Sequence, residues 1–181
     1  MMSSEQKWYI LDAYNDFDME KDVRYRLFRR WDSTKPKVGV IMFNPKQVNP
    51  NPFVLGQTLG KITKLLVDQH QHGSIEVVNL FAKTSDSKKL FPREYKKFDS
   101  ENFEYIQKVV EESEKVVLFW GNGGSVVSKN PRFIELLKKH NHKLWCFGIT
   151  NKSQPKYVRT LGDSNELISC KVDNNGNICV I

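Results

Sequence analysis

Four short segments of the sequence carry the polar side chains best suited to chemistry. They are Asn44-Pro45, Asn79, Trp120-Gly121-Asn122 and Ser153-Gln154-Pro155. An amide side chain can both donate and accept a hydrogen bond, so it can hold a water molecule or recognise the edge of a base. Unlike a carboxylate, it cannot take a proton from that water. Each amide also has a structural interpretation, because Asn44 could bond to the backbone of a turn before Pro45 and Asn79 could tie two loops together.

Aromatic residues flank the same segments. Phe43, Phe53 and Phe81 lie near the ends of apolar runs, where an aromatic ring could stack on a base. Core packing is the competing interpretation for each of them, and also for Trp120. Residues 121–125, GNGGS, could bind an anion through backbone N–H groups or could form a plain turn, because their spacing matches neither of the common glycine-rich phosphate-binding loops.

The charge balance permits a polyanionic partner. Lys and Arg number 28 against 21 Asp and Glu, which gives a net charge of +7 and a pI of about 9.2. Basic side chains that neutralise phosphates release counterions, and this release favours binding to DNA. The alternative is a solvated basic surface with local ion pairs. The candidates for contact with nucleic acid are Arg24, Arg26, Arg30, Lys46, Lys83, Lys88, Lys89 and Lys156.

Neither a metal site nor a cofactor is predicted. Three cysteines without a CxxC spacing indicate neither a disulfide framework nor a set of zinc ligands. The two His-x-His pairs, at 70–72 and 140–142, are expected at helix ends. No apolar stretch reaches the roughly 20 residues that a membrane-spanning helix needs, and the acidic N-terminus lacks the layout of a secretion signal. We therefore expect a cytoplasmic protein without a membrane partner.

Apolar patterning predicts the elements that carry these residues. A run that is apolar on both faces is typical of a buried strand, and such runs lie at 38–43, 75–81, 115–121 and 144–149. Apolar residues at helical spacing predict helices at 55–70, 100–113 and 131–140. Residues 24–31 are expected as an edge or second-layer strand. Strict alternation would place Arg24, Arg26 and Arg30 on one side of it and Tyr25, Leu27 and Arg29 on the other.

Strands that alternate with helices indicate a three-layer α/β/α fold with a mostly parallel central sheet. Residues 166–172 and 177–181 flank an Asp-Asn-Asn-Gly turn and predict a C-terminal β-hairpin. We expect a single domain over residues 1–181, with an acidic arm at 1–22, a core at 24–160 and the hairpin within 161–181. Because ligands of open parallel sheets bind outside the carboxyl ends of the strands, the polar segments are expected to meet there in one cavity.

Five segments in order resemble an uncharacterised family of bacterial and phage proteins, the domain-of-unknown-function family 1643. The segments are RYRLFRRWD, VGVIMFNPKQ, IEVVNLFA, VVLFWGN, and FGIT followed by QPKY, and they span about residues 24–160. That family has no established reaction. The resemblance therefore implies a relationship, with phages or mobile elements as a source, and no particular activity.

The same segments resemble, more distantly, the uracil-DNA glycosylase superfamily, which implies that fold and several residue roles. Asn44-Pro45 matches the motif that positions the attacking water, and Asn79 matches the Asn that reads the flipped base. Phe119-Trp120-Gly121 matches a third motif, whereas Gln154-Pro155 stands where His-Pro is expected. The resemblance implies catalytic roles for Asn44 and Gln154 and substrate contacts for Pro45, Asn79 and Trp120. Their places near the strand ends add Phe43, Phe53 and Asn122 to the expected substrate contacts.

Two departures from that superfamily's pattern bear on activity. Gln154 could donate a hydrogen bond to a leaving base, but an amide cannot be tuned as an imidazole can. Asn44 cannot act as a general base. We therefore expect binding of DNA, a nucleotide or a nucleobase at the strand ends, with weak or no base excision. The alternatives are an active DNA glycosylase and a protein-interaction module, in which Trp8, Tyr9, Ile10 and the C-terminal hairpin could form a homodimer surface.

Overall fold

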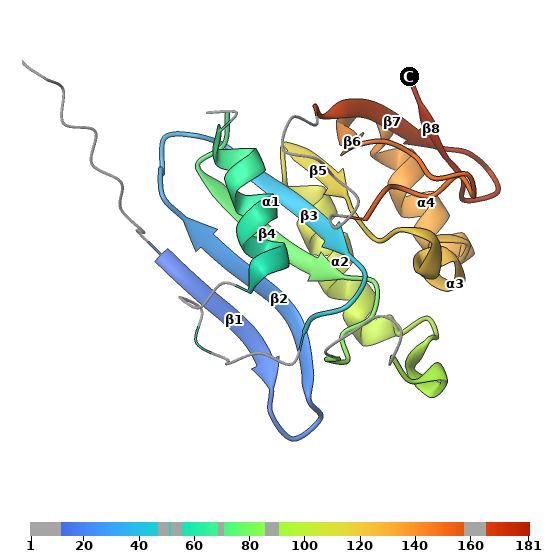
Figure 1. Cartoon of the computed structure of the whole chain (residues 1–181), viewed down its shortest axis with the longest axis horizontal. Coiled ribbons are helices and arrows are strands. Elements are labelled where there is room, and N and C mark those ends of the chain that lie inside the picture. Colours follow the sequence, from blue (N-terminus) through green and yellow to red (C-terminus); the bar gives the residue numbers. More distant parts are fainter. Residues whose placement is uncertain (1–11, 47–50, 52–55, 69–70, 86–90, 158–165) are drawn as a thin grey trace, which may run out of the picture.

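The protein folds around one eight-stranded β-sheet, as the computed structural model shows (Figure 1). The structure describes residues 12–46, 51, 56–68, 71–85, 91–157 and 166–181. The strand order across the sheet is β1-β2-β4-β3-β5-β6-β7-β8. The strands are β1 (Asp12–Asp18), β2 (Val23–Arg30), β3 (Lys37–Met42), β4 (Ser74–Asn79), β5 (Lys115–Leu118), β6 (Leu144–Cys146), β7 (Ile168–Val172) and β8 (Ile178–Val180).

The sheet is mixed, so the expectation of a mostly parallel sheet is wrong. Strands β4, β3, β5 and β6 pair in parallel. The other four of the seven pairings, β1-β2, β2-β4, β6-β7 and β7-β8, are antiparallel. Apolar runs identify buried strands, but the strands at both flanks carry many polar residues, and their direction is set by tight connections that apolar patterning does not report.

Strand β1 lies within the segment expected to be an acidic arm. It is held to β2 in part by an aromatic contact, because the Tyr14 ring stacks on Phe28 with ring centroids 4.9 Å apart. Its acidic residues meet basic partners, since Asp16 forms an ion pair with Arg26 of β2. The pairing of β1 with β2 is irregular: Asp16 faces Arg26 and Phe17 faces Arg24, which leaves Tyr25 as an extra residue in β2.

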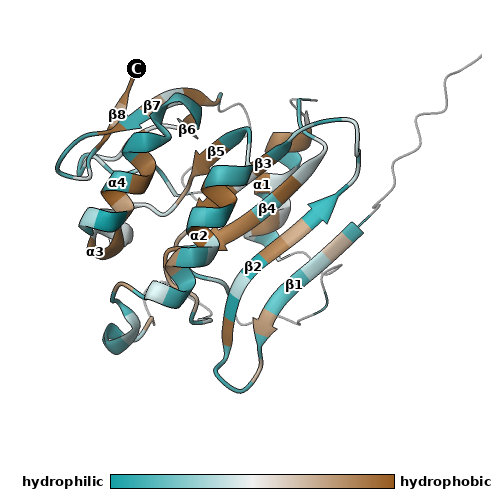
Figure 2. Ribbon diagram, turned by 180° about the vertical axis from the view of Figure 1, so that it is seen from behind, coloured by the Kyte–Doolittle hydropathy of each residue, from teal (hydrophilic) through white to brown (hydrophobic). Residues whose placement is uncertain are grey.

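Helices cover both faces of the sheet (Figures 1 and 2). Helix α1 (Gln57–Asp68) lies on one face, and α2 (Ser100–Glu112), the short α3 (Ser125–Ser128) and α4 (Pro131–Lys139) lie on the other. Short 3₁₀ turns occupy Arg93–Tyr95, Asn122–Gly124 and Asn141–Lys143. Helix α2 begins at Ser100 because the Asp99 side chain accepts hydrogen bonds from the backbone N–H groups of Glu101 and Asn102.

Alternate residues of the central strands build two separate cores. In β3, Val38 and Val40 pack with Leu59, Ile62 and Leu66 of α1. Their neighbour Ile41 points to the other face and joins the core formed with α2 and α4. The apolar colouring of these strands, between two helical layers, is visible in Figure 2.

The C-terminal strands β7 and β8 form a hairpin that extends the sheet. The carboxylate of Asp173 stabilises the turn by accepting hydrogen bonds from the backbone N–H groups of Asn175 and Asn177, both at 2.8 Å. Strand β7 also pairs with β6, so the hairpin continues the sheet beyond the parallel strands. Among the described helices, none is long and apolar enough to cross a membrane.

Candidate functional site

A pocket lies between the ends of β2 and β3 and the first turn of α1. We call it the strand-end pocket, and the described residues that line it are Arg24, Met42, Asn44, Lys46, Gly56, Thr58, Leu59 and Tyr157. It encloses about 40 Å³, which is room for roughly three water molecules. A space of this size suits one small group of a larger ligand. Arg24, Asn44 and Lys46 were among the residues singled out from the sequence.

Asn79 is not among the described lining residues, but it lies on the strand between those that line the pocket. In the sheet order β4 sits between β2 and β3, the two strands whose residues line the pocket, and Asn79 is in register with Met42. Alternation along β4 places Asn79 on the same face as Ile75 and Val77, which is the α1 face. The Asn79 side chain is fully buried, and neither Oδ1 nor Nδ2 has a hydrogen-bond partner among the described residues.

Asn44 reaches the pocket from the residues that follow β3. Its Nδ2 donates to the carbonyl oxygen of Pro45 at 2.8 Å and to that of Ser85 at 3.3 Å. These bonds fix the amide and leave its Oδ1 as the atom able to accept a hydrogen bond from a water molecule or a ligand. Pro45 itself is buried and is absent from the described lining of the pocket.

Arg24 is a buried cation at the pocket wall. Only 9% of its surface is exposed, and its Nε has no hydrogen-bond partner. In the described part of the chain we find no ion pair to its guanidinium. Burial lowers the pKa of Arg24 to about 10, and the charge of Arg29 adds to this effect. The group therefore stays charged at neutral pH without a counterion, an arrangement that costs folding free energy.

The extra residue Tyr25 explains why Arg24 faces the pocket. Strict alternation would place Arg24 and Arg26 on the same face of the sheet. The bulge in β2 inserts Tyr25 as an extra residue, so the side chain of Arg24 points to the opposite face. Arg24 therefore shares the α1 face with Leu27, whereas Arg26 points to the opposite face. The predicted grouping of Arg24, Arg26 and Arg30 on one side is wrong for this reason.

Gln154 is not part of the strand-end pocket. Its Oε1 accepts hydrogen bonds from Trp120 Nε1 at 2.8 Å and from Ser128 Oγ at 2.9 Å. Trp120 is fully buried and packs on Phe133 of α4, so this amide belongs to the other face of the sheet. Asn44 lines the strand-end pocket, Asn79 lies at the end of the neighbouring strand outside the described lining, and Gln154 lies apart, which corrects the expectation of one shared cavity.

The other residues expected to contact a substrate lie elsewhere. Phe43 is buried in an aromatic cluster with Phe81 and Phe91, at centroid distances of 5.0 and 5.6 Å, so its ring does not face the pocket. Asn122 is exposed, and its Oδ1 accepts from Thr150 Oγ1. Phe53, Lys88, Lys89, His70, Trp8, Tyr9 and Ile10 lie outside the described residues.

The remaining basic candidates are dispersed. Arg30 pairs with Ser74, at the end of the sheet opposite to the pocket. Lys83 donates to the carbonyl oxygen of Lys21 at 3.0 Å. The Lys156 side chain packs over Gly148. Of the basic residues singled out from the sequence, Arg24 and Lys46 are therefore the described ones that the fold brings to the pocket.

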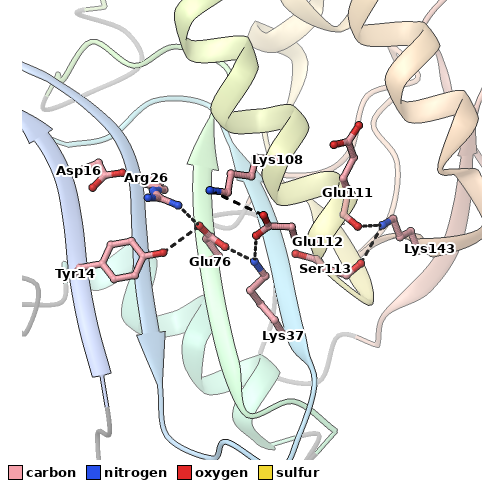
Figure 3. Close-up of polar contacts among 10 residues, drawn as sticks. All are labelled: Tyr14, Asp16, Arg26, Lys37, Glu76, Lys108, Glu111, Glu112, Ser113 and Lys143. Atoms are coloured by element: carbon pink, nitrogen blue, oxygen red, sulfur yellow. Dashed lines mark hydrogen bonds and ion pairs between the residues drawn. The ribbon is translucent and has the colours of Figure 1, made fainter.

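A second cluster of charges surrounds Glu76 on the opposite face of β4 (Figure 3). Its carboxylate accepts from Lys37 Nζ at 2.5 Å, from Arg26 Nη1 at 3.3 Å and from Tyr14 Oη at 3.4 Å. Lys37 also pairs with Glu112 of α2 at 3.1 Å. Burial and the nearby Glu76 raise the pKa of Tyr14 to about 12. We call this the Glu76 network; its charges have partners within the chain.

Sequence reasoning missed both the Glu76 network and part of the pocket. The network had a signal, because Glu76 is a charged residue inside the apolar run 75–81. Thr58, Leu59 and Tyr157 carry no such signal, since only the packing of α1 and of the residue 157 segment brings them to β3. Within the described ranges, no group of His, Cys, Asp or Glu could hold a metal ion, and the three cysteines are not disulfide-bonded.

Comparison with known proteins places the chain in a family. The model of a family described as "Protein of unknown function (DUF1643)" matches residues 24–157, from the second strand to the pocket residue Tyr157. The chain belongs to the DUF1643 family. The strand-end pocket of this DUF1643 protein lies wholly within the matched region. No curated protein and no solved structure matched the chain.

Proposed function

We propose that this DUF1643 protein binds DNA or a nucleotide at the strand-end pocket and does not excise the base. The observation that carries the proposal is Asn79, a fully buried amide on the strand between those that line the pocket, with neither polar atom partnered among the described residues. A buried amide without partners costs about 1–3 kcal/mol. A ligand that displaces the side chains covering Asn79, and presents a donor and an acceptor side by side to its amide, would recover that cost.

The edge of a nucleobase has this pattern of donor beside acceptor, and enzymes read bases in this way. Two cations at the pocket, Arg24 and Lys46, suit the phosphate that accompanies a base. The overall charge of +7 would favour the approach of a polyanion. A distant relationship to the uracil-DNA glycosylase superfamily is part of this proposal, and it rests on Asn44-Pro45 and Asn79.

Three features favour binding over excision. No carboxylate or histidine, the most common general bases, is found among the described residues that line the pocket. The Asn44 Nδ2 is already engaged with two carbonyl oxygens. The Gln154 amide bonds to Trp120 and Ser128, away from the pocket, so it cannot support a leaving base there.

The test is a binding titration with fluorescein-labelled single- and double-stranded oligonucleotides, followed by anisotropy, together with calorimetric titration of nucleoside monophosphates. We expect salt-sensitive binding that weakens at least tenfold in Asn79→Leu, which removes the amide at similar volume. The matched control Asn122→Ala removes an exposed amide outside the pocket and should bind as the wild type does.

Excision is tested separately with a uracil-containing oligonucleotide and alkaline cleavage. We expect the strand to stay intact at stoichiometric protein. Cleavage that Asn44→Ala abolishes would overturn the second half of the proposal. Absence of binding to both the oligonucleotides and the monophosphates, at low ionic strength, would overturn the first.

A further inference from the structure

Three sources of hydrogen-bond donors line the strand-end pocket. They are the side chains of Arg24 and Lys46 and the first turn of α1, from Gly56 to Leu59. They come from three separate elements, so their meeting is a property of the fold and not of one local motif.

The Arg24 side chain has no counterion among the described residues, although the residue is about nine-tenths buried. The neighbouring charge that acts on it is Arg29, another cation, so the surrounding protein adds repulsion instead of compensation. Lys46, at the same pocket, forms no ion pair with any described residue. An arginine cannot discard its proton at neutral pH. Among the described residues no counterion is found, so an anion from solution is a source of compensation that fits this site.

The start of α1 adds neutral donors to these cations. The helix begins after Gly56, whose carbonyl oxygen accepts from the Gly60 N–H at 2.9 Å and which has no side chain to cap the first turn. No acidic residue lies in that turn, and Thr58 adds a hydroxyl at the pocket. The first N–H groups of a helix have no acceptor within it, and the helix dipole places partial positive charge there.

The size of the pocket and the number of donors discriminate between anions. The enclosed space of about 40 Å³ admits one small group from one side. A terminal phosphate presents three oxygens and close to two negative charges at neutral pH. An internal phosphodiester carries a single charge and two bulky substituents, so it would use fewer of these donors.

We propose that Arg24, Lys46 and the first turn of α1 bind the phosphate of a phosphate monoester, such as a nucleotide or a terminal phosphate of a nucleic acid. The identity of the rest of that ligand rests on the proposed function. The site binds the phosphate group and breaks none of its bonds.

The experiment measures melting temperature and calorimetric binding on the full chain with two probes, methyl phosphate and dimethyl phosphate, at matched ionic strength. We expect methyl phosphate to raise the melting temperature of the wild type in a concentration-dependent way and to bind at least tenfold more tightly than the diester. Arg24→Met should lose at least tenfold in affinity for methyl phosphate. Arg30→Met, a cation at the other end of β2, should behave as the wild type.

Equal affinity for the two probes, or unchanged methyl phosphate binding in Arg24→Met, would overturn the inference. That outcome is distinguishable from failure of the proposed function. If nucleotides bind and Arg24→Met has no effect, the phosphate site is wrong and the function stands. If methyl phosphate binds through Arg24 while oligonucleotides and nucleotides do not bind, the phosphate site stands and the function is wrong.

Discussion

The two faces of the sheet around β4 differ in whether their buried polar groups have partners. On the α2 face, the Glu76 carboxylate accepts from Lys37, Arg26 and Tyr14, and its charge is balanced within the chain (Figure 3). On the α1 face, Arg24 is nearly buried and its Nε has no hydrogen-bond partner among the described residues. The Asn79 amide is fully buried, and neither its Oδ1 nor its Nδ2 has such a partner. The sheet around β4 therefore has a polar network with all its charges paired on one face, and polar groups that lack partners among the described residues on the other.

This difference separates a structural role from a binding role. Removing one partner of a buried, fully paired charge strongly destabilises the fold, but such a charge has no free hydrogen-bonding capacity for a ligand. A buried polar group without partners reduces stability and keeps its hydrogen-bonding capacity available for a ligand. We therefore assign the Glu76 network to the fold and the strand-end pocket to function, and the substitutions below test that assignment.

The largest effect is expected from Glu76→Gln. The substitution removes the buried negative charge shared by Arg26 and Lys37 and leaves each cation with one other acidic partner, Asp16 or Glu112. We expect the free energy of unfolding, measured by urea titration, to fall by about 3 kcal/mol, the lower end of the cost of breaking a buried ion pair. A loss below about 1 kcal/mol would show that the network is not structural and would remove the contrast between the two faces.

The next largest effect is expected from His72, a buried group that can avoid carrying a charge by losing its proton. It is buried, neither ring nitrogen has a partner among the described residues, and burial lowers its pKa from 6.5 to about 4. The folded protein thus disfavours the protonated ring. Stability should be constant above pH 6.5 and fall by about 2–3 kcal/mol as the pH drops from 6.5 to 4. His72→Leu should flatten this acid limb in urea titrations; an unchanged limb would assign it to other groups.

Arg24→Met is expected to have a smaller effect of opposite sign. Unlike His72, Arg24 cannot become neutral at working pH, so removing its charge should stabilise the unliganded protein by about 1–2 kcal/mol. Thermal and urea unfolding in chloride buffer, without phosphate, would measure this gain. The matched substitution Arg30→Met should change stability by less than about 0.5 kcal/mol. Destabilisation by Arg24→Met would mean that Arg24 already has a partner.

The smallest effect is expected at the rim of the Glu76 network. Lys108 pairs with Glu112 at 4.0 Å, and both side chains are about half exposed. Lys108→Ala should therefore change the free energy of unfolding by less than about 0.5 kcal/mol. A loss comparable to that of Glu76→Gln would show that the network depends on its exposed members as much as on its buried centre.

Much of the site's position could be predicted, because it depends on adjacent parallel strands. Asn44 and Asn79 follow or end two apolar runs, and β3 and β4 pair in parallel, so their carboxyl ends lie at one edge. Gln154 could not be placed in this way. Its partner Trp120 faces α4, and the face on which a loop amide settles depends on packing between distant segments.

The fold was less predictable at its flanks. The sequence of β1, DAYNDFD, has the composition of an acidic arm, and only its pairing with β2 turns it into a strand. The direction of β2 and of the strands after β6 depends on connections instead of on apolar content. The bulge at Tyr25 had no local signal, yet it decides that Arg24 reaches the pocket.

The position of β2 has a consequence for motion. In the sheet, β1 and β2 join the other strands only along β4, within the described pairings. Arg24 belongs to this N-terminal hairpin, whereas Lys46 and the start of α1 belong to the remainder of the molecule. A ligand in the pocket would contact both the hairpin and α1, so local unfolding of β1 and β2 would become rarer. Ligand binding would therefore slow the opening of β1, at the edge of the sheet, although β1 does not line the pocket.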